Sequence, residues 1–173
     1  MKVYLASPYG FAESTRAYLG SIKTVLTKAR IQVVDPWEIG AKLLTATRVK
    51  SAMESKESLV ALHNLSSNLA ELNRRAIDGS DVVIAGLDGP DIDSGTASEI
   101  GYAFAMGKLV LGLRSDIRRS GENEGVRINL QVQYWIEKSG GQVVESIHDL
   151  LPLLSEPRKR PAAGPSVARP PET

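Results

Sequence analysis

The sequence predicts an α/β protein with a parallel sheet of about five strands and helices on both of its faces. Short apolar runs alternate along the chain with longer segments of helical periodicity, which is the order expected of strand–helix–strand units. Glycine, proline and polar residues bound the apolar runs, as is typical of buried strands. These observations favour a single doubly wound, flavodoxin-like sheet, a fold that binds ligands outside the carboxyl ends of its strands.

The first half of the chain is expected to contribute two strands and two long helices. The strands are predicted at 2–6 and 31–34, and the helices at 14–30 and 59–78. We interpret Asp35 to Glu38 as the loop that leaves the second strand, and 39–58 as a short helix with a connection.

The second half is expected to contribute three strands, three helices and a tail. The strands are predicted at 81–85, 109–113 and 142–144, and the helices at 97–107, 129–139 and 147–154. The composition changes at Glu156, because five of the nine prolines fall after it. We therefore expect one domain over 1–155, followed by a Pro-rich, disordered tail over 156–173.

Composition argues against several classes of function. A net charge of +1 gives no electrostatic reason to expect nucleic acid or an anionic membrane as a partner. The chain has no cysteine, and its two histidines, His63 and His148, lack metal-ligand spacing, so we expect no metal or other cofactor. No apolar run approaches membrane-spanning length and the N-terminus lacks a signal-peptide layout, which favours a cytoplasmic protein.

The most informative stretch connects the strand predicted at 81–85 to the helix that follows it. It carries two carboxylates, Asp93 and Glu99, at the sheet edge where such folds bind ligands. Spacing alone favours a simpler interpretation, in which Thr96 and Glu99 form a capping box at the helix start. Asp93 is likewise typical of a turn or capping aspartate.

The longer string Asp93-Ser94-Gly95-Thr96-Ala97-Ser98-Glu99-Ile100-Gly101-Tyr102-Ala103, followed by Gly107-Lys108, closely resembles the nucleoside 2-deoxyribosyltransferase family. The resemblance implies a transferase that exchanges the base of a 2′-deoxynucleoside for a free nucleobase. It makes Glu99 the nucleophile that attacks the anomeric carbon, giving a covalent glycosyl-glutamate in a retaining double displacement. We expect Glu99 in the first helical turn, where the helix N-terminus favours its anionic form.

The same resemblance assigns roles to the residues around Glu99. It implies that Tyr4 orients Glu99 through its hydroxyl, although a tyrosine here is equally typical of a half-buried strand. It implies that Asp93 contacts the sugar and takes part in proton transfer, and that Gly95 belongs to the substrate-binding motif. Asn73 matches a position that handles the leaving base and is often aspartate in the family. An asparagine cannot donate a proton as an acid, so the group that protonates the base is left open.

Asn129 resembles an asparagine that the family contributes to the sugar site of a neighbouring subunit. This implies a homo-oligomer with active sites near the subunit interfaces, although Asn129 is also typical of a helix N-cap. The base is expected beside two exit loops, where aromatic rings stack on a base and polar groups bond its edge. The candidates, each equally typical of loop packing, are Ser7, Phe11, Pro36, Trp37 and Glu38.

Two other functions remain open. One is a hydrolase, in which water captures the glycosyl-enzyme or the substrate is a nucleoside 5′-monophosphate. The first loop has no arginine before Arg16, and Asp93 would repel a phosphate, which favours the uncharged nucleoside. The other is a non-catalytic nucleoside-binding module, against which the presence of Glu99, Asp93, Tyr4 and Asn129 argues.

Overall fold

A five-stranded sheet forms the centre of the structure, a computed structural model that describes residues 1–155. The predicted tail, 156–173, lies outside the described residues. The strands are β1 (Lys2–Ala6), β2 (Gln32–Val34), β3 (Val82–Gly86), β4 (Leu109–Leu113) and β5 (Val143–Val144). All neighbouring strands run parallel, in the order β2-β1-β3-β4-β5. This confirms the predicted doubly wound α/β sheet. The chain first adds β2 on one side of β1 and then β3, β4 and β5 on the other, so the strand order reverses between β1 and β3.

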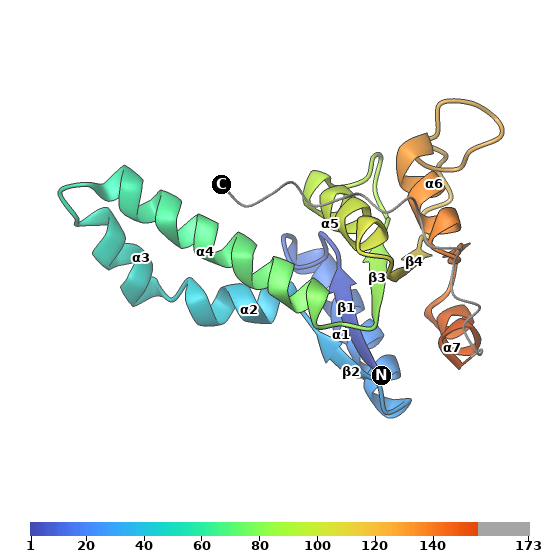
Figure 1. Cartoon of the computed structure of the whole chain (residues 1–173), viewed down its shortest axis with the longest axis horizontal. Helices are drawn as coiled ribbons and strands as arrows, with labels where there is room; N and C mark the ends of the chain where they lie inside the picture. Colours follow the sequence, from blue (N-terminus) through green and yellow to red (C-terminus); the bar gives the residue numbers. More distant parts are fainter. Residues whose placement is uncertain (156–173) are drawn as a thin grey trace, which may run out of the picture.

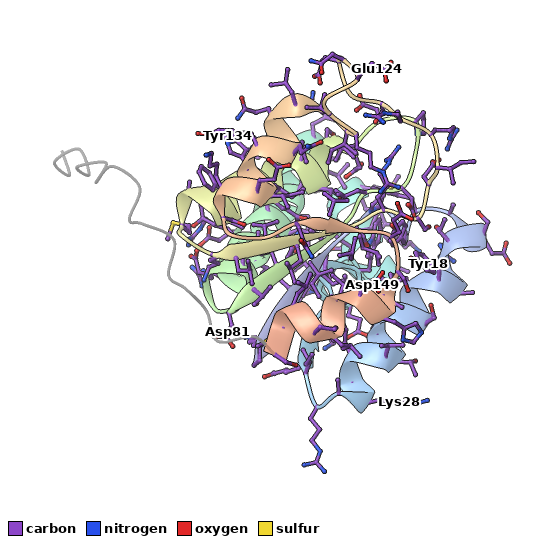
Figure 2. All side chains as sticks on the ribbon, turned by 90° about the vertical axis from the view of Figure 1, so that its right-hand side faces the viewer. Tyr18, Lys28, Asp81, Glu124, Tyr134 and Asp149 are labelled. Carbon is purple, nitrogen blue, oxygen red and sulfur yellow. The ribbon has the colours of Figure 1, made fainter. Side chains whose placement is uncertain are left out.

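Helices cover both faces of this sheet (Figure 1). They are α1 (Glu13–Lys28), α2 (Pro36–Leu43), α3 (Ala46–Met53), α4 (Ser58–Asp78), α5 (Ser94–Ala105), α6 (Leu130–Lys138) and α7 (Ile147–Ser155). One core cluster joins α1 and α7 to one face, and Figure 2 shows α7, with Asp149, beside α1, with Lys28. The second core cluster joins α4, α5 and α6 to the other face.

The alternation of side chains along β1 decides which residue faces which layer of helices. Val3 and Leu5 belong to the cluster under α1 and α7, whereas Tyr4 and Ala6 belong to the cluster under α5. Tyr4 is fully buried, so its hydroxyl can find a partner only within the protein. The sheet therefore directs Tyr4 toward α5, the helix that carries Glu99.

The segment at 35–38 is not the loop that the sequence predicted. Pro36 is the first residue of α2, and the Asp35 side chain caps this helix by accepting a 2.9 Å hydrogen bond from the Trp37 backbone N–H. An aspartate N-cap followed by proline is a strong helix-start signal, because the fixed φ of proline suits the first turn. The expected exit loop is therefore helical from Pro36 onward.

Helix α5 begins three residues earlier than predicted, which corrects the interpretation of Thr96 and Glu99. The N-cap is Asp93, whose Oδ2 accepts hydrogen bonds from the Thr96 N–H at 2.9 Å and the Thr96 hydroxyl at 3.1 Å. Thr96 is thus inside the helix, and no capping box with Glu99 forms. Glu99 lies in the second turn, one turn further from the helix N-terminus than expected.

Helices α2, α3 and α4 form an arm that extends well past the edge of the sheet (Figure 1). The arm reaches the core at the end of α4 nearest β3, where Ile77 is buried, and at Trp37 of α2, which packs against the core cluster on the opposite face of the sheet. At the far end of the arm Met53, Leu59 and Val60 are exposed. The arm therefore joins the sheet at two places: α2 begins at the carboxyl end of β2, and α4 ends before the amino end of β3.

A buried arginine ties together the loops that leave β3 and β4. Arg114 is 0% exposed, and its guanidinium donates hydrogen bonds to three backbone oxygens, those of Leu87, Gly89 (3.1 Å) and Arg118 (2.8 Å). Next to it, the Asp88 carboxylate accepts from the Tyr9 hydroxyl at 3.0 Å and from the Ser115 N–H at 2.7 Å. Three loops at the ligand-binding edge of the sheet are therefore held to one another.

Candidate active site

A cavity of about 540 Å³ opens where the strand order reverses, at the junction between the sheet and the arm. Its walls come from the loop after β1, from α2, from α4 and from the start of α5. The lining residues are Ser7, Phe11, Pro36, Trp37, Gly40, Ala41, Leu44, Leu69, Asn73, Asp93, Gly95, Thr96 and Glu99. The carboxyl ends of parallel strands are the usual ligand site of this fold, and the cavity lies there.

The structure brings Tyr4 and Glu99 together, as the resemblance implied. The Tyr4 hydroxyl donates a 2.6 Å hydrogen bond to Glu99 Oε1. Burial and the adjacent carboxylate hold the pKa of Tyr4 far above its ordinary value, so the hydroxyl stays protonated and remains a donor. Glu99 Oε2 accepts no hydrogen bond from residues 1–155 and is not among their buried unpartnered atoms. One carboxylate oxygen is fixed, and the other is left for a ligand.

The electrostatics of Glu99 differ from the expectation. Its pKa is raised to about 6: burial is the largest cause and the negative charge of Asp93 adds to it, while the hydrogen bond from Tyr4 acts in the opposite direction. The helix N-terminus does not dominate, because the side chain lies in the second turn and the effect falls off within the first. Glu99 is therefore a carboxyl that ionises near neutrality rather than a strongly stabilised anion.

Asp93 combines the capping role with a position in the cavity. Its Oδ2 serves the Thr96 cap, whereas its Oδ1 makes no hydrogen bond to the described part of the chain. Gly95 lies beside it, and a Cβ added there would approach Asp93 Oδ2 to 3.2 Å. A sugar hydroxyl is a suitable donor for the free oxygen of Asp93.

Trp37 forms a rigid wall of the cavity. Its indole Nε1 donates a 2.9 Å hydrogen bond to the Ser7 backbone oxygen, and the Phe11 ring meets it edge-on with centroids 4.4 Å apart. Gly10 packs directly against the indole, since a Cβ added at this position would lie 2.1 Å from Trp37 Cδ2. Phe11 itself is 72% exposed, so it forms the outer rim of the site.

We expect Gly10→Ala to displace Trp37, because no Cβ fits at that distance. The free energy of unfolding should fall by about 1–3 kcal/mol, and the Trp37 fluorescence emission should shift to longer wavelength as the indole meets water. The measurement needs a Trp135→Phe background, so that Trp37 is the only indole. Gly20→Ala is the matched control, since a Cβ at Gly20 has nothing within 4 Å. Equal spectra for the two variants would contradict the packing argument.

Two buried polar atoms without a partner in residues 1–155 line this cavity, Ser7 Oγ and Asn73 Oδ1. Ser7 is 6% exposed, so its hydroxyl has little access to bulk water. An unpaired buried polar atom costs free energy, which a ligand carrying the complementary group would recover. The Asn73 oxygen needs a donor, such as an N–H on the edge of a nucleobase.

Two predicted site residues lie away from the cavity walls. The Glu38 carboxylate pairs with Lys23 and is largely exposed. Asn129 caps α6 by accepting from the Gln131 N–H at 3.1 Å, and its amide donates to Glu122 at 2.9 Å. The single chain does not bring either residue to Glu99, and the contribution of Asn129 to a neighbouring subunit stays a prediction.

A second hollow of about 390 Å³ reaches Glu99 from another side. Glu99, Asn73 and Gly95 line both spaces, and the second is completed by Ala70, Arg74, Ile77, Ser98 and Tyr102. Arg74 is not a free cation there, because it pairs with Glu71 at 2.8 Å and Asp78 at 2.6 Å. Within residues 1–155 the hollow therefore offers no unpaired positive charge for a phosphate.

Sequence reasoning missed one side of the cavity, formed by Gly40, Ala41, Leu44 and Leu69. The capping signal at Asp35-Pro36 could have revealed α2, but nothing local indicates that α2 and α4 cross here. Among residues 1–155 no group of three or more side chains has the arrangement of a metal site. Within the same residues no helix combines the length and apolar character that crossing a bilayer requires.

Comparisons with known proteins identify the family of the chain. Residues 3–131 match the family model of nucleoside 2-deoxyribosyltransferase. An uncharacterized Schizosaccharomyces pombe protein, C191.05c, is 31% identical over 120 residues, which are 67% of this chain but only 51% of that protein. The chain thus spans about half the length of this relative.

Two solved structures resemble the whole fold. A conserved protein from Enterococcus faecalis V583 is 28% identical, with a TM-score of 0.64 over 88% of this chain and 95% of its own. The 2-deoxyribosyltransferase of Bacillus psychrosaccharolyticus shares the fold at 24% identity, with a TM-score of 0.61 over 87% of this chain and 90% of its own. Since the family model covers most of the sequence, including β1, the arm and the Glu99 motif, the chain belongs to the nucleoside 2-deoxyribosyltransferase family.

Proposed function

We propose that the protein is a nucleoside 2-deoxyribosyltransferase, which moves a 2-deoxyribosyl group from one nucleobase to another through a covalent intermediate on Glu99. The observation that carries the proposal is the state of the Glu99 carboxylate. One oxygen is held by Tyr4 at 2.6 Å, the other has no hydrogen-bond partner among residues 1–155, and Glu99 lines a cavity of about 540 Å³. A carboxylate held in this way suits the positive charge that develops at an anomeric carbon.

In the first half-reaction, Glu99 Oε2 attacks the anomeric carbon of the 2′-deoxynucleoside. A C–O bond to Glu99 forms, the C–N bond to the base breaks, and its electron pair leaves with the base nitrogen. Water supplies the proton that this nitrogen takes up, because the Asn73 amide is not an acid. In the second half-reaction the nitrogen of another base attacks the same carbon and loses its proton to the hydroxide that the first half-reaction left. The C–O bond to Glu99 breaks, its electron pair returns to the carboxylate, and the configuration is retained.

The remaining residues would hold the substrate in the required orientation. The free Oδ1 of Asp93 accepts from a sugar hydroxyl, beside Gly95. The base lies between Trp37 and Asn73, with Ser7, Phe11 and Pro36 completing its surroundings. Holding the sugar beside the Glu99 carboxylate in one site removes much of the entropic cost of their encounter.

The proposal predicts the products of a simple assay. With 2′-deoxyinosine as donor, 2′-deoxyadenosine should accumulate only when free adenine is present. The products are separated by chromatography and quantified with and without the acceptor. Release of free deoxyribose at equal rates in both samples would reject the transferase.

Hydrolysis of the same N-glycosidic bond is the second candidate function. The observation in its favour is the second hollow, which Glu99 also lines and in which water could lie beside the carboxylate. The assay above separates the two candidates, because a hydrolase needs no acceptor base. A pyrimidine donor and a 5′-monophosphate donor in parallel tubes extend the test to the other substrate classes.

We expect Tyr4→Phe to shift the pH profile of transfer rather than abolish it. In the parent enzyme kcat/KM should rise with pH through about 6, as Glu99 ionises. Loss of the Tyr4 hydrogen bond removes the group that lowers the pKa of Glu99, so the rise should move up by roughly one pH unit. The measurement is kcat/KM between pH 4.5 and 8.5.

Tyr9→Phe is the matched control for this shift. Tyr9 is also a buried tyrosine that donates to a carboxylate, in this case Asp88, but it does not contact Glu99. Tyr9→Phe should leave unchanged the pH at which kcat/KM rises. If kcat/KM rose at the same pH in Tyr4→Phe and in the parent enzyme, Tyr4 would not influence the pKa of Glu99.

A further inference from the structure

We propose that the site takes nucleobases that carry an apolar substituent next to an N–H donor, and that the substituent occupies the end of the cavity lined by Gly40, Ala41, Leu44 and Leu69. We call this end the apolar annex. The inference rests on the proposed function and narrows its substrate class.

The walls of the apolar annex contain no polar side chain. Its four residues come from α2, its C-terminal end and the facing side of α4. The ionisable residues that line the same cavity, Asp93 and Glu99, belong to the start of α5 instead. A charged or strongly hydrated group would lose its water in the annex without gaining a partner, so the occupant should be neutral and apolar.

The annex also has room. A Cβ added at Gly40 would meet only the two methyl carbons of Leu69, both at 3.9 Å, which is ordinary van der Waals contact. Elsewhere in the site the packing is tight, as the 2.1 Å approach of a Cβ at Gly10 to Trp37 shows. Filling this end with an apolar group would release water from apolar walls, which is favourable.

The orientation of a bound base connects the annex to Asn73. Asn73 Oδ1 is buried and unpartnered, so it selects a base edge that carries an N–H. Leu69 precedes Asn73 by four residues on α4, which places it on the same helix face about 6 Å along the axis. An alkyl or aryl group attached to the nitrogen that donates to Asn73 would therefore extend toward Leu69. A secondary amine meets both requirements, because it keeps one N–H and carries one substituent.

The test compares acceptors in pairs, with 2′-deoxyinosine and 2′-deoxyuridine as donors. Adenine is paired with N6-benzyladenine, and cytosine with N4-benzylcytosine, so that either purine or pyrimidine preference is covered. We expect kcat/KM to be on the order of tenfold or more higher for the benzylated member of the accepted pair. Equal or lower values for the benzylated bases, with normal turnover of the parent bases, would overturn the inference while leaving the proposed function intact.

Variants of the annex provide a second readout. Gly40→Leu fills the annex and should reduce the benzylated-to-parent ratio of kcat/KM by on the order of tenfold. Gly20→Leu is the matched control on α1, where an added side chain has open space and should leave the ratio unchanged. Thermal denaturation of both variants checks that each is folded. An unchanged ratio in folded Gly40→Leu would reject the annex as the site of the substituent.

If the proposed function is wrong, the experiment gives a different result. In that case no base of either pair consumes the donor, and calorimetric binding to the parent protein decides the inference instead. Tighter binding of a benzylated base than of its parent, lost in Gly40→Leu, would support the annex. Equal affinities within each pair would overturn it.

Discussion

Glu99→Gln is expected to reduce base transfer by on the order of 10³-fold or more, because the amide is a far weaker nucleophile than the carboxylate. The fold should persist, since the glutamine side-chain oxygen can still accept the hydrogen bond from Tyr4. Initial rates of 2′-deoxyadenosine formation, with circular dichroism of the same samples, measure both effects. Trapping the parent enzyme with a slow donor and finding the sugar on the peptide that contains Glu99 would identify the intermediate directly.

The same substitution should make the protein more stable above pH 6. The pKa of Glu99 is raised to about 6 in the folded state, chiefly by burial, so the folded protein holds the proton more tightly than the unfolded chain does. The associated stability is complete below the unfolded pKa and is lost as the pH rises through the folded pKa. Glu99→Gln carries no charge there, and should gain about 1–2 kcal/mol in the free energy of unfolding at pH 8 but almost nothing at pH 4.

Glu57→Gln is the control for both measurements. Glu57 precedes α4 on an exposed part of the arm, and its side chain makes no capping hydrogen bond. It should change neither transfer nor the pH dependence of stability. Parent-like transfer by Glu99→Gln would end the assignment of Glu99 as nucleophile, and a stability difference independent of pH would contradict the burial argument.

Arg114→Met is expected to reduce the free energy of unfolding by about 3 kcal/mol or more. Methionine fills much of the buried volume but donates nothing, so the carbonyl oxygens of Leu87, Gly89 and Arg118 lose their donors. Buried carbonyls without partners are costly, and these belong to the loops that follow β3 and β4. Urea denaturation at constant pH measures the effect from the shift of the midpoint and the slope.

Arg118→Met separates this effect from the mere loss of a positive charge. The Arg118 side chain is 63% exposed and pairs with Asp116, so its removal should cost less than about 1 kcal/mol. If the two variants lost the same stability, the buried guanidinium would not be holding the loops. Transfer should also fall in Arg114→Met, because the loop after β3 leads directly to the Asp93 cap.

The sheet could be predicted because its signal is local. Each buried strand is a short apolar run between turn residues, and the alternation of strands with helices fixes a parallel α/β architecture. The pairing of Tyr4 with Glu99 followed from resemblance to a family, since nothing in the spacing of residues so far apart indicates a contact. The structure supplies that contact through the side-chain alternation of β1.

The errors arose where two local signals competed. Asp93 and Thr96 are both good N-caps, and each has a plausible partner three residues later, so the sequence alone does not decide where α5 begins. The Asp93 side chain takes the cap and moves Glu99 into the second turn. That shift, together with the burial of the Glu99 side chain, accounts for the wrong expectation about its charge.

Other features have no local signal at all. Arg114 follows a strand in a polar stretch, where an arginine is usually solvated, and its burial depends on backbone oxygens from distant residues. The apolar annex depends on the crossing of α2 and α4, which side-chain packing between helices decides. Both are properties of the assembled fold rather than of any segment.

The division of the cavity between sheet and arm has a consequence for how this protein could change during evolution. The groups proposed to act on the sugar lie on β1 and α5, whereas most of the residues proposed to surround the base come from one uninterrupted stretch of chain, 36–73. Mutations in that stretch can alter which bases fit without disturbing Tyr4, Asp93 or Glu99. The arm is therefore a natural unit for diversification, and exchanging it between relatives should transfer base preference while the chemistry stays with the recipient.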